Sequence, residues 1–119
     1  MLCFLAALGA AFLVGMRLTS GPIPFDRARW DAPSSDWQDT TRHRMADGLI
    51  ESRTLIGLSR TEIVKLLGEP SQSPYFQPEW DLEYVLGIER GFFIRIDSEH
   101  LVIRLSSGGR ATAAGLARD

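Results

Sequence analysis

An uninterrupted apolar segment at the N-terminus is the feature that most constrains how this chain of 119 residues can fold. Residues 2–16 are all apolar, and the first charged side chain is that of Arg17. As a helix rising about 1.5 Å per residue, this run would extend about 22 Å. A membrane span needs at least about 17 residues, a limit that residues 1–18 approach if Arg17 reaches to the interface. A core helix of a soluble domain would need a polar face, which the run lacks. We therefore expect residues 1–18 to form a single-pass membrane anchor.

A cleaved export signal, which would release the protein into the periplasm, is the alternative for the same residues. Such a signal carries a basic region before its apolar run and small residues at its cleavage site, and this segment has neither in clear form. A lipid anchor is not expected, because the sole cysteine, Cys3, lies near the start of the run rather than just after it. One cysteine also excludes an internal disulfide and a cysteine-rich zinc site.

The charge balance argues against a nucleic-acid partner. The 13 Lys and Arg residues are outnumbered by 15 Asp and Glu residues, which gives a net charge of −2. A nucleic-acid-binding protein needs a basic surface to neutralise phosphates, and attraction to anionic lipid needs a basic cluster. We expect no nucleic acid as a partner, and membrane association would depend on residues 1–18.

Residues 19–39 form a predicted linker, in which Gly, Pro and Ser interrupt any periodic pattern. Phe25, Trp30 and Trp37 make this segment too apolar for a plain spacer. The preferred interpretation is that these rings pack back on the folded domain, and the alternative is that they contact a partner. The domain itself is predicted to occupy residues 40–119.

The first predicted helix of the domain covers residues 41–54. Met45, Leu49 and Ile50 are spaced so that they fall close together on a helix, and charged side chains occupy its other faces. Gly48 weakens such a helix by about 1 kcal/mol relative to Ala, so its presence indicates close packing at that point.

The second predicted helix has the best-defined boundaries. Ser59 and Glu62 match a capping box, in which the serine side chain caps the helix and the glutamate reaches back to the N–H of the cap. Leu58 and Ile63 form the matching hydrophobic staple. Gly and Pro at positions 68 and 70 end the helix.

Beyond the second helix, apolar and polar residues alternate as they do in strands. The predicted strands are residues 80–86, 92–97, 101–105 and a weaker one at 110–116, with a tight turn at Ser98 and Glu99. Two helices followed by a three- to four-stranded antiparallel meander, preceded by an N-terminal hydrophobic helix, make an α+β fold. The helices are expected to cover the apolar face of the sheet, and the other face is expected to lie in water. The predicted core consists of Met45, Leu49, Ile50, Leu55, Leu58, Ile63, Leu66, Leu67, Leu82, Tyr84, Leu86, Ile94, Ile96, Leu101, Ile103 and Leu105.

Residues 55–70 read Leu-Ile-Gly-Leu-Ser-Arg-Thr-Glu-Ile-Val-Lys-Leu-Leu-Gly-Glu-Pro. They resemble the G-M-T-x-x-E-V-x-x-L-L-G-x-P signature of the BamE-like (SmpA/OmlA) small bacterial envelope proteins. Tyr-Val-Leu-Gly at 84–87 and Gly-Gly-Arg at 108–110 fit the same plan of two helices and three strands. The resemblance covers about residues 45–110 and implies a non-catalytic interaction module in the bacterial envelope.

The resemblance has one departure. BamE-like proteins are lipoproteins, and this chain lacks a suitable cysteine, so it is more similar to uncharacterised relatives than to the barrel-assembly component itself. The resemblance implies that the domain faces the envelope, whereas the position of every basic residue after the apolar run favours a cytoplasmic domain. The orientation therefore stays open.

The histidines give little indication of a metal site or of catalysis. His43 and His100 have no neighbouring Cys or His, and a metal site needs about three protein ligands, so both are expected at the surface. Residues 97–100, Asp-Ser-Glu-His, hold the residue types of a hydrolytic triad. Neighbours in one tight turn cannot align as a triad, so we interpret them as turn residues.

Charged side chains on the polar face of the sheet are further candidates. Asp81 and Glu83 alternate along one strand about 7 Å apart, and Arg95 and Arg104 are expected on neighbouring strands. Ion pairs across the sheet are the preferred interpretation, because opposite charges on adjacent strands stabilise a sheet. An anion-binding patch at Arg95 and Arg104 is the alternative.

The sequence favours a binding or scaffolding module over an enzyme, because it offers neither a nucleophile with a base nor a set of metal ligands. Another envelope protein is the expected partner, and no small-molecule cofactor is expected. Strand edges could accept this partner, together with aromatic side chains. The candidate partner-binding residues are Trp80, Tyr84, Phe92 and Phe93. The alternative is a small hydrolase or anion-binding enzyme that uses Asp81, Glu83 and Arg95.

Overall fold

A computed structural model describes residues 21–32, 34, 36, 38–90 and 97–119 of the chain. The elements in this part are α2 (Arg27–Asp31), α3 (Thr41–Glu51), α4 (Arg60–Leu67), β1 (Leu82–Ile88), β2 (Ser98–Leu105) and β3 (Ala111–Arg118). Helices followed by a three-stranded antiparallel sheet confirm the predicted α+β class. The hydrophobic helix predicted for residues 1–18 lies outside the described residues. Within the described part, no helix is both long and apolar enough to cross a membrane.

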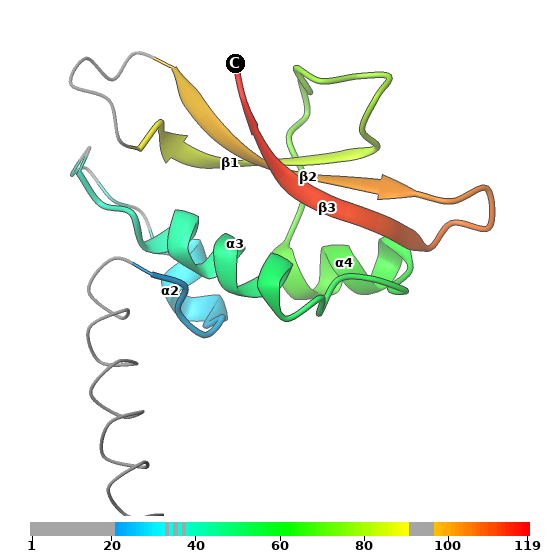
Figure 1. Cartoon of the computed structure of the whole chain (residues 1–119), viewed down its shortest axis with the longest axis horizontal. Coiled ribbons are helices and arrows are strands. Elements are labelled where there is room, and N and C mark those ends of the chain that lie inside the picture. Colours follow the sequence, from blue (N-terminus) through cyan, green and yellow to red (C-terminus); the bar gives the residue numbers. More distant parts are fainter. Residues whose placement is uncertain (1–20, 33, 35, 37, 91–96) are drawn as a thin grey trace, which may run out of the picture.

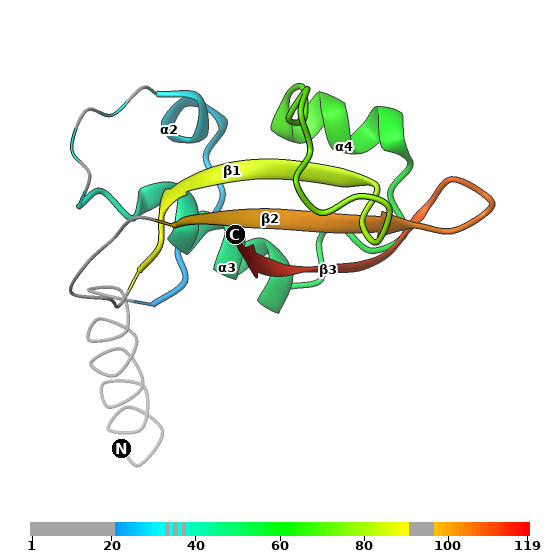
Figure 2. The same cartoon turned by 90° about the horizontal axis from the view of Figure 1, so that it is seen from above.

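The sheet has the order β1-β2-β3, and both pairs of neighbours are antiparallel. In its middle, Tyr84 pairs with Leu101, and Leu101 pairs with Leu116. The three helices lie against one face of the sheet, and the connection from α4 to β1 rises over the other face (Figure 1). Seen from above, β1 and β3 form the two edges of the sheet (Figure 2).

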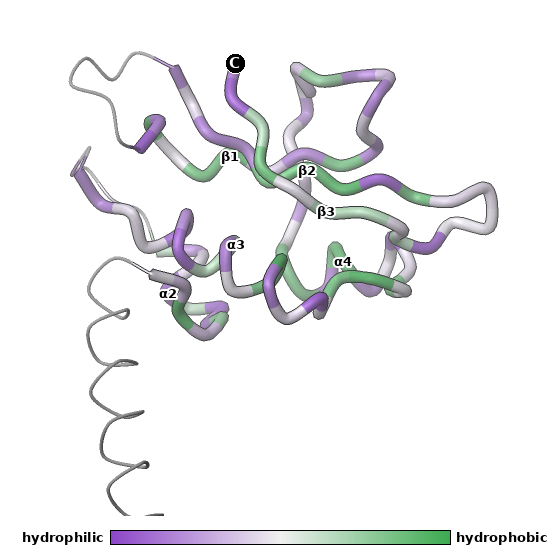
Figure 3. The backbone as a smooth tube through the Cα atoms, viewed as in Figure 1, coloured by the Kyte–Doolittle hydropathy of each residue, from purple (hydrophilic) through white to green (hydrophobic). Residues whose placement is uncertain are grey.

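The core lies between the helices and the sheet, where hydrophobic stretches of β1, β2 and α4 gather (Figure 3). The predicted core residues that are fully buried are Met45, Leu49, Leu55, Ile63, Leu67, Leu82, Tyr84, Leu86, Leu101 and Ile103. Ile50, Leu58, Leu66 and Leu105 are partly buried against them. Ile94 and Ile96 lie outside the described residues. The buried hydrophobic residues that the predicted core omits are Ile23, Trp30, Ala46, Val102 and Ala111.

Helix α4 has the predicted boundaries for the predicted reason. The Ser59 side chain accepts a hydrogen bond from the Glu62 N–H at 3.1 Å, and the Glu62 carboxylate accepts one from the Ser59 N–H at 3.1 Å. This capping box satisfies two N–H groups that the first turn of a helix otherwise leaves open. The helix ends at Leu67, and Gly68 follows with a φ of 89°, which favours glycine.

Helix α3 is shorter than predicted, because the backbone leaves the helix after Glu51. Arg53 has a φ of 57°, in the left-handed region. The Arg53 N–H donates to the Ile50 carbonyl at 3.1 Å, and the Thr54 N–H donates to the Leu49 carbonyl at 3.2 Å. These two bonds form a Schellman motif, which ends a helix by satisfying its last carbonyls.

The segment before α3, predicted as a linker, packs against the helices. Asp26 caps the short helix α2, and Trp30 is 1% exposed, with its indole Nε1–H donating to the Leu67 carbonyl at 2.9 Å. The Phe25 ring lies 5.7 Å from the Trp30 ring, between centroids. The prediction that these aromatic rings pack back on the domain is confirmed for Phe25 and Trp30, while Trp37 lies outside the described residues.

Two predictions about the strands are wrong. β1 runs through Gly87 to Ile88, and an irregularity in register between Val85 and Gly87 accommodates the glycine within the strand. β2 begins at Ser98, so Ser98 and Glu99 belong to a strand rather than to a tight turn. Among the described residues β1 pairs directly with β2, and residues 92–96 of the strand predicted at 92–97 lie outside the described part.

Candidate functional site

The aromatic residues predicted to bind a partner do not form one surface. Tyr84 is 3% exposed and belongs to the core, and its hydroxyl donates to the Gly68 carbonyl at 2.8 Å. Burial raises the pKa of Tyr84 to about 12, so the hydroxyl stays protonated at neutral pH. Its assignment as a partner-binding residue is therefore wrong. Trp80 is half-buried, with the Arg104 guanidinium 4.5 Å from its ring centroid. Phe92 and Phe93 lie outside the described residues.

The predicted ion pairs of Asp81 and Glu83 with Arg104 do not form in the described part of the chain, where both carboxylates accept hydrogen bonds from backbone N–H groups. The Asp81 carboxylate accepts a hydrogen bond from the Leu105 N–H at 2.6 Å. The Glu83 carboxylate accepts from the Tyr75 N–H at 2.7 Å and from the Phe76 N–H at 3.1 Å. Glu83 is 3% exposed, so this face of the sheet is covered at that point and does not lie in water as predicted. Arg104 donates from Nε to the Glu79 carbonyl at 3.3 Å, and Arg95 lies outside the described residues.

Both histidines are buried, contrary to the prediction of surface positions. His43 is 1% exposed, and its Nε2 lies 2.9 Å from the Ile88 carbonyl oxygen. Because a carbonyl can only accept, Nε2 carries the proton. His100 is 5% exposed, with Nε2 3.1 Å from an Asp119 carboxylate oxygen and its ring 5.3 Å from that of Phe76. The described part of the chain holds no group of three His, Cys, Asp or Glu residues able to ligate a metal ion.

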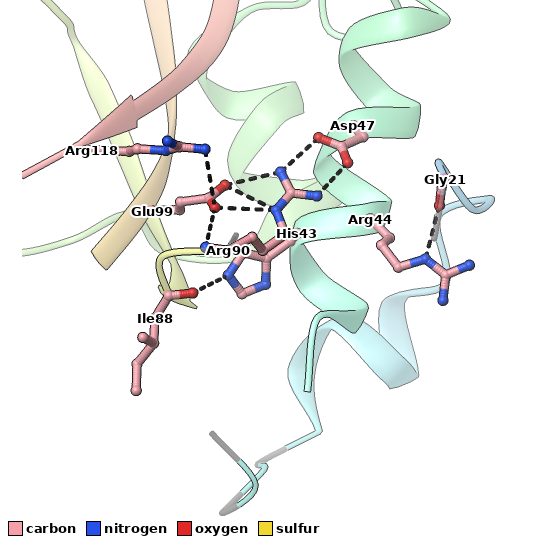
Figure 4. A network of polar contacts seen from close by, with 8 residues as sticks. All are labelled: Gly21, His43, Arg44, Asp47, Ile88, Arg90, Glu99 and Arg118. Atoms are coloured by element: carbon pink, nitrogen blue, oxygen red, sulfur yellow. Dashed lines mark hydrogen bonds and ion pairs between the residues drawn. The ribbon is translucent and has the colours of Figure 1, made fainter. Parts of the chain in front are cut away.

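A buried charged cluster connects α3 to the sheet (Figure 4). The Arg90 guanidinium donates to the Asp47 carboxylate at 2.6 and 3.1 Å and to a Glu99 oxygen at 2.9 Å. Burial acts to raise the pKa of Glu99, but hydrogen bonds from Arg90 and its charge outweigh burial and lower this pKa. On the opposite side, Arg118 lies 3.1 Å from Glu89 and 3.8 Å from Glu99.

This cluster was not predicted, although the sequence contained one signal for it. Glu99 lies two residues before Leu101 and four before Ile103. In a strand that begins at Ser98, its side chain therefore points to the helices, as theirs do. Through Arg90, which binds both Asp47 and the buried Glu99, the cluster connects α3 to the start of β2.

The two edges of the sheet differ in their backbone hydrogen bonds. At the edge formed by β1, the Glu83 carbonyl accepts from the Ser71 N–H at 2.7 Å, and the Val85 carbonyl accepts from Arg42 Nη1 at 2.7 Å. Both carbonyls therefore point away from β2 and are satisfied. The β1 edge is closed at these positions.

Along the edge formed by β3, backbone hydrogen bonds to another described segment occur only at the first residue, Ala111. The Ala111 N–H donates to the Leu58 carbonyl at 2.8 Å, and the Ala111 carbonyl accepts from the Gly57 N–H at 2.8 Å. At the other end of the strand, the Asp119 N–H donates to the Ser98 carbonyl at 3.3 Å, so Asp119 points toward β2.

The alternation of residues along a strand then shows which backbone groups between the two ends of β3 point away from β2. Val102 and His100 pair with the β1 residues that point away from β2, so they direct their own N–H and C=O groups to β3. Their β3 partners, Gly115 and Ala117, therefore point inward. Ala114 and Leu116 point outward, and no backbone hydrogen bond joins their outward groups to another described residue. Thr112 is the extra residue of a register irregularity opposite Arg104 and Leu105, where the alternation is interrupted.

The free edge of β3, residues 113–116, has the properties of a binding surface. Residues 111–117 carry neither charge nor proline, the devices that usually protect an exposed edge strand. Leu116 is 40% exposed. A cavity of about 210 Å³ lies beside this edge, lined by Leu49, Ile50, Arg53, Leu55, Ile56, Thr112, Ala113 and Ala114.

No family model matches the chain, and neither do the curated proteins or the solved structures with which it was compared. The similarity of residues 55–70 to the BamE-like signature therefore stays a prediction. The evidence for function lies in the geometry of the domain.

Proposed function

We propose that the chain is a non-catalytic interaction module held at the bacterial envelope, and that the free edge of β3 is its binding surface. The observation that carries this proposal is the pair of residues Ala114 and Leu116, whose outward N–H and C=O groups have no backbone partner among the described residues. An extended segment of another protein would add to β3 as a fourth strand. In such strand addition, backbone hydrogen bonds supply affinity, and pockets for alternate side chains supply specificity.

The envelope location rests on two features of the sequence. Residues 1–18 have the composition of a single membrane span, with a cleaved export signal as the alternative. The BamE-like signature at residues 55–70 belongs to small envelope proteins. Both features are consistent with another envelope protein as the partner, whereas the net charge of −2 gives no support to a nucleic-acid partner.

The alternative of a small hydrolase or anion-binding enzyme receives less support from the geometry. Its proposed acid and base, Asp81 and Glu83, both accept backbone hydrogen bonds that hold the sheet and its covering loop. Arg104 stacks on Trp80 instead of standing free. An enzyme needs polar groups that converge on a pocket. These side chains instead bind backbone N–H groups or pack against a ring. Turnover of a panel of ester and phosphoester substrates by the purified chain would favour the enzyme.

A substitution in the free edge of β3 tests the binding surface. Leu116→Pro removes the outward N–H and places a ring where a partner strand would pair, but it removes no hydrogen bond of the sheet. Leu116→Ala is the matched control, because it shortens the side chain and keeps the N–H. Cross-linking in intact cells should join the full chain to a specific envelope protein in the wild type and in Leu116→Ala, but not in Leu116→Pro. Equal cross-linking of a folded Leu116→Pro chain would show that the edge is not the binding surface.

A further inference from the structure

We infer that the free edge of β3 selects an extended peptide segment with an apolar side chain and an acidic side chain on the same face, and that Arg53 binds the carboxylate. This inference rests on the proposed function and adds the chemistry of the partner to it. It follows from three observations: the position of Arg53, the lining of the cavity beside β3, and the charges that β3 itself lacks.

Arg53 holds its side chain at the cavity without a partner in the described part of the chain. It follows the last turn of α3 in the left-handed conformation, with a φ of 57°. Glycine is the usual residue there, since any Cβ is strained in this conformation. The exposed Arg53 side chain forms neither a hydrogen bond nor an ion pair with a described residue. A long cation thus occupies a position that local backbone preferences would give to glycine.

The cavity supplies an apolar site next to this cation. Of the eight residues that line it, Arg53 is the one that carries a charge, and Leu49, Ile50 and Ile56 supply apolar walls. Its volume of about 210 Å³ far exceeds the room for one water molecule, which needs roughly 10–15 Å³. A strand added to β3 would direct every second side chain to the helix-facing side, where this cavity lies.

Spacing along the added strand sets the pattern of the ligand. Side chains two residues apart lie on the same face and about 7 Å from each other. An apolar side chain in the cavity would therefore have its neighbour on that face at the rim, where Arg53 lies. A carboxylate at this position can accept paired hydrogen bonds from the guanidinium.

A second copy of this chain fits the site less well than such a peptide. β3 reads Ala-Thr-Ala-Ala-Gly-Leu-Ala-Arg, so a β3 strand paired with its copy offers no carboxylate to Arg53. Charge complementarity therefore favours an acidic segment of another protein over self-association.

Binding of defined peptides to the full chain in detergent micelles tests this inference. The probe is a fluorescent, end-blocked eight-residue peptide of alternating Thr and Val in which one Val is replaced by Glu; the comparison peptide has Lys at the same position. Fluorescence anisotropy should show the Glu peptide binding about tenfold more tightly than the Lys peptide. Arg53→Gly should abolish this preference, and Arg53→Lys should retain most of it. Arg53→Gly suits the glycine-favouring backbone, so the variant should remain folded.

The possible outcomes separate the inference from the proposed function. If both peptides bind equally well to the wild type and binding is lost in Leu116→Pro, strand addition stands and the acidic preference is wrong. If neither peptide binds, the inference is overturned, while cross-linking at Leu116 still judges the proposed function. If the wild type sediments as a dimer that Leu116→Pro dissociates, a second copy occupies the edge and the acidic peptide does not.

Discussion

Arg53 shows how the backbone conformation of a single surface residue can lower the stability of the fold. Its left-handed backbone, with φ at 57°, strains any side chain that has a Cβ. We predict that Arg53→Gly raises the free energy of unfolding by up to about 1 kcal/mol, after the greater freedom of glycine in the unfolded chain is subtracted. Denaturant titration of both proteins measures this difference. Arg53→Ala is the control, because it removes the charge and keeps the Cβ. Equal stability of the Gly and Ala variants would contradict the argument from strain.

His43 is the residue with the clearest effect of pH. Burial is the main cause that lowers its pKa below the ordinary value of 6.5, because the charged imidazolium would lose its hydration. The unfolded chain therefore binds more protons than the folded chain at any pH between the two pKa values. Stability is then complete above about pH 6.5 and falls as the pH decreases below it.

The corresponding measurement is the urea midpoint at pH 7 and at pH 5.5. We predict a lower midpoint at pH 5.5 for the wild type and a smaller pH effect in His43→Gln, whose amide can still donate to the Ile88 carbonyl. Glu99 has a lowered pKa, so the stability it provides is lost only below the ordinary value of 4.5, outside this range. The same pH effect in both proteins would mean that His43 does not titrate as argued.

Among the elements, α3 depends on a close contact with the segment before it. A Cβ at Gly48 would lie 2.5 Å from the Ile23 carbonyl oxygen, a backbone atom that cannot rotate away. Alanine would favour the helix by about 1 kcal/mol, but the clash requires residues 21–25 to move off α3. We predict a net destabilisation of about 1–3 kcal/mol for Gly48→Ala. A thermal melt measures it, and an unchanged or higher melting temperature would show that this contact is loose.

The elements also show which parts of the fold could be predicted. The boundaries of α4 follow from Ser59, Glu62 and Gly68, which act within a few residues of one another, so the sequence contains the whole cause. The start of β2 was missed because Ser98 and Glu99 resemble turn residues. Glu99 is compatible with a buried strand because Arg90 and Arg118 lie against its carboxylate, and Arg90 is held in turn by Asp47, 43 residues away in the chain. Local patterns do not contain such partners.

The sequence predicted the kind of candidate site, a strand edge, but not which edge of the sheet it would be. That strand edges could accept a partner follows from any small antiparallel sheet. Which edge is free depends on Ser71 and Arg42, which close β1, and on residues 57–58, which close only the start of β3. None of these contacts has a signal in the sequence. Tyr84 alternates with Leu82 and Leu86, so the sequence already indicated the core position that it takes.

At the scale of the whole molecule, the described elements cover the two faces of the sheet to different extents. Helices cover one face of the sheet, and the connection between α4 and β1 covers part of the other (Figure 1). Trp80 and Phe76 belong to this connection, and Phe76 packs on His100 of β2. With β1 closed at the carbonyls of Glu83 and Val85, the free edge of β3 is where, in the described part of the chain, we expect the sheet to accept a further strand.

The last prediction concerns the whole chain and its attachment to the membrane. If residues 1–18 span the bilayer, the full-length protein should stay with membranes after extraction with alkaline carbonate. Leu8→Arg together with Phe12→Arg should release it, because each central arginine costs about 2.5–3.5 kcal/mol in a membrane span. Immunoblotting of the soluble and membrane fractions measures both proteins and their sizes. Uncut wild-type protein in the soluble fraction would exclude the anchor, and a shortened soluble form would identify residues 1–18 as a cleaved export signal. A periplasmic partner can reach the free edge of β3 in either of the two exported arrangements, so a reporter at the C-terminus that is active only in the cytoplasm would contradict the envelope-facing placement.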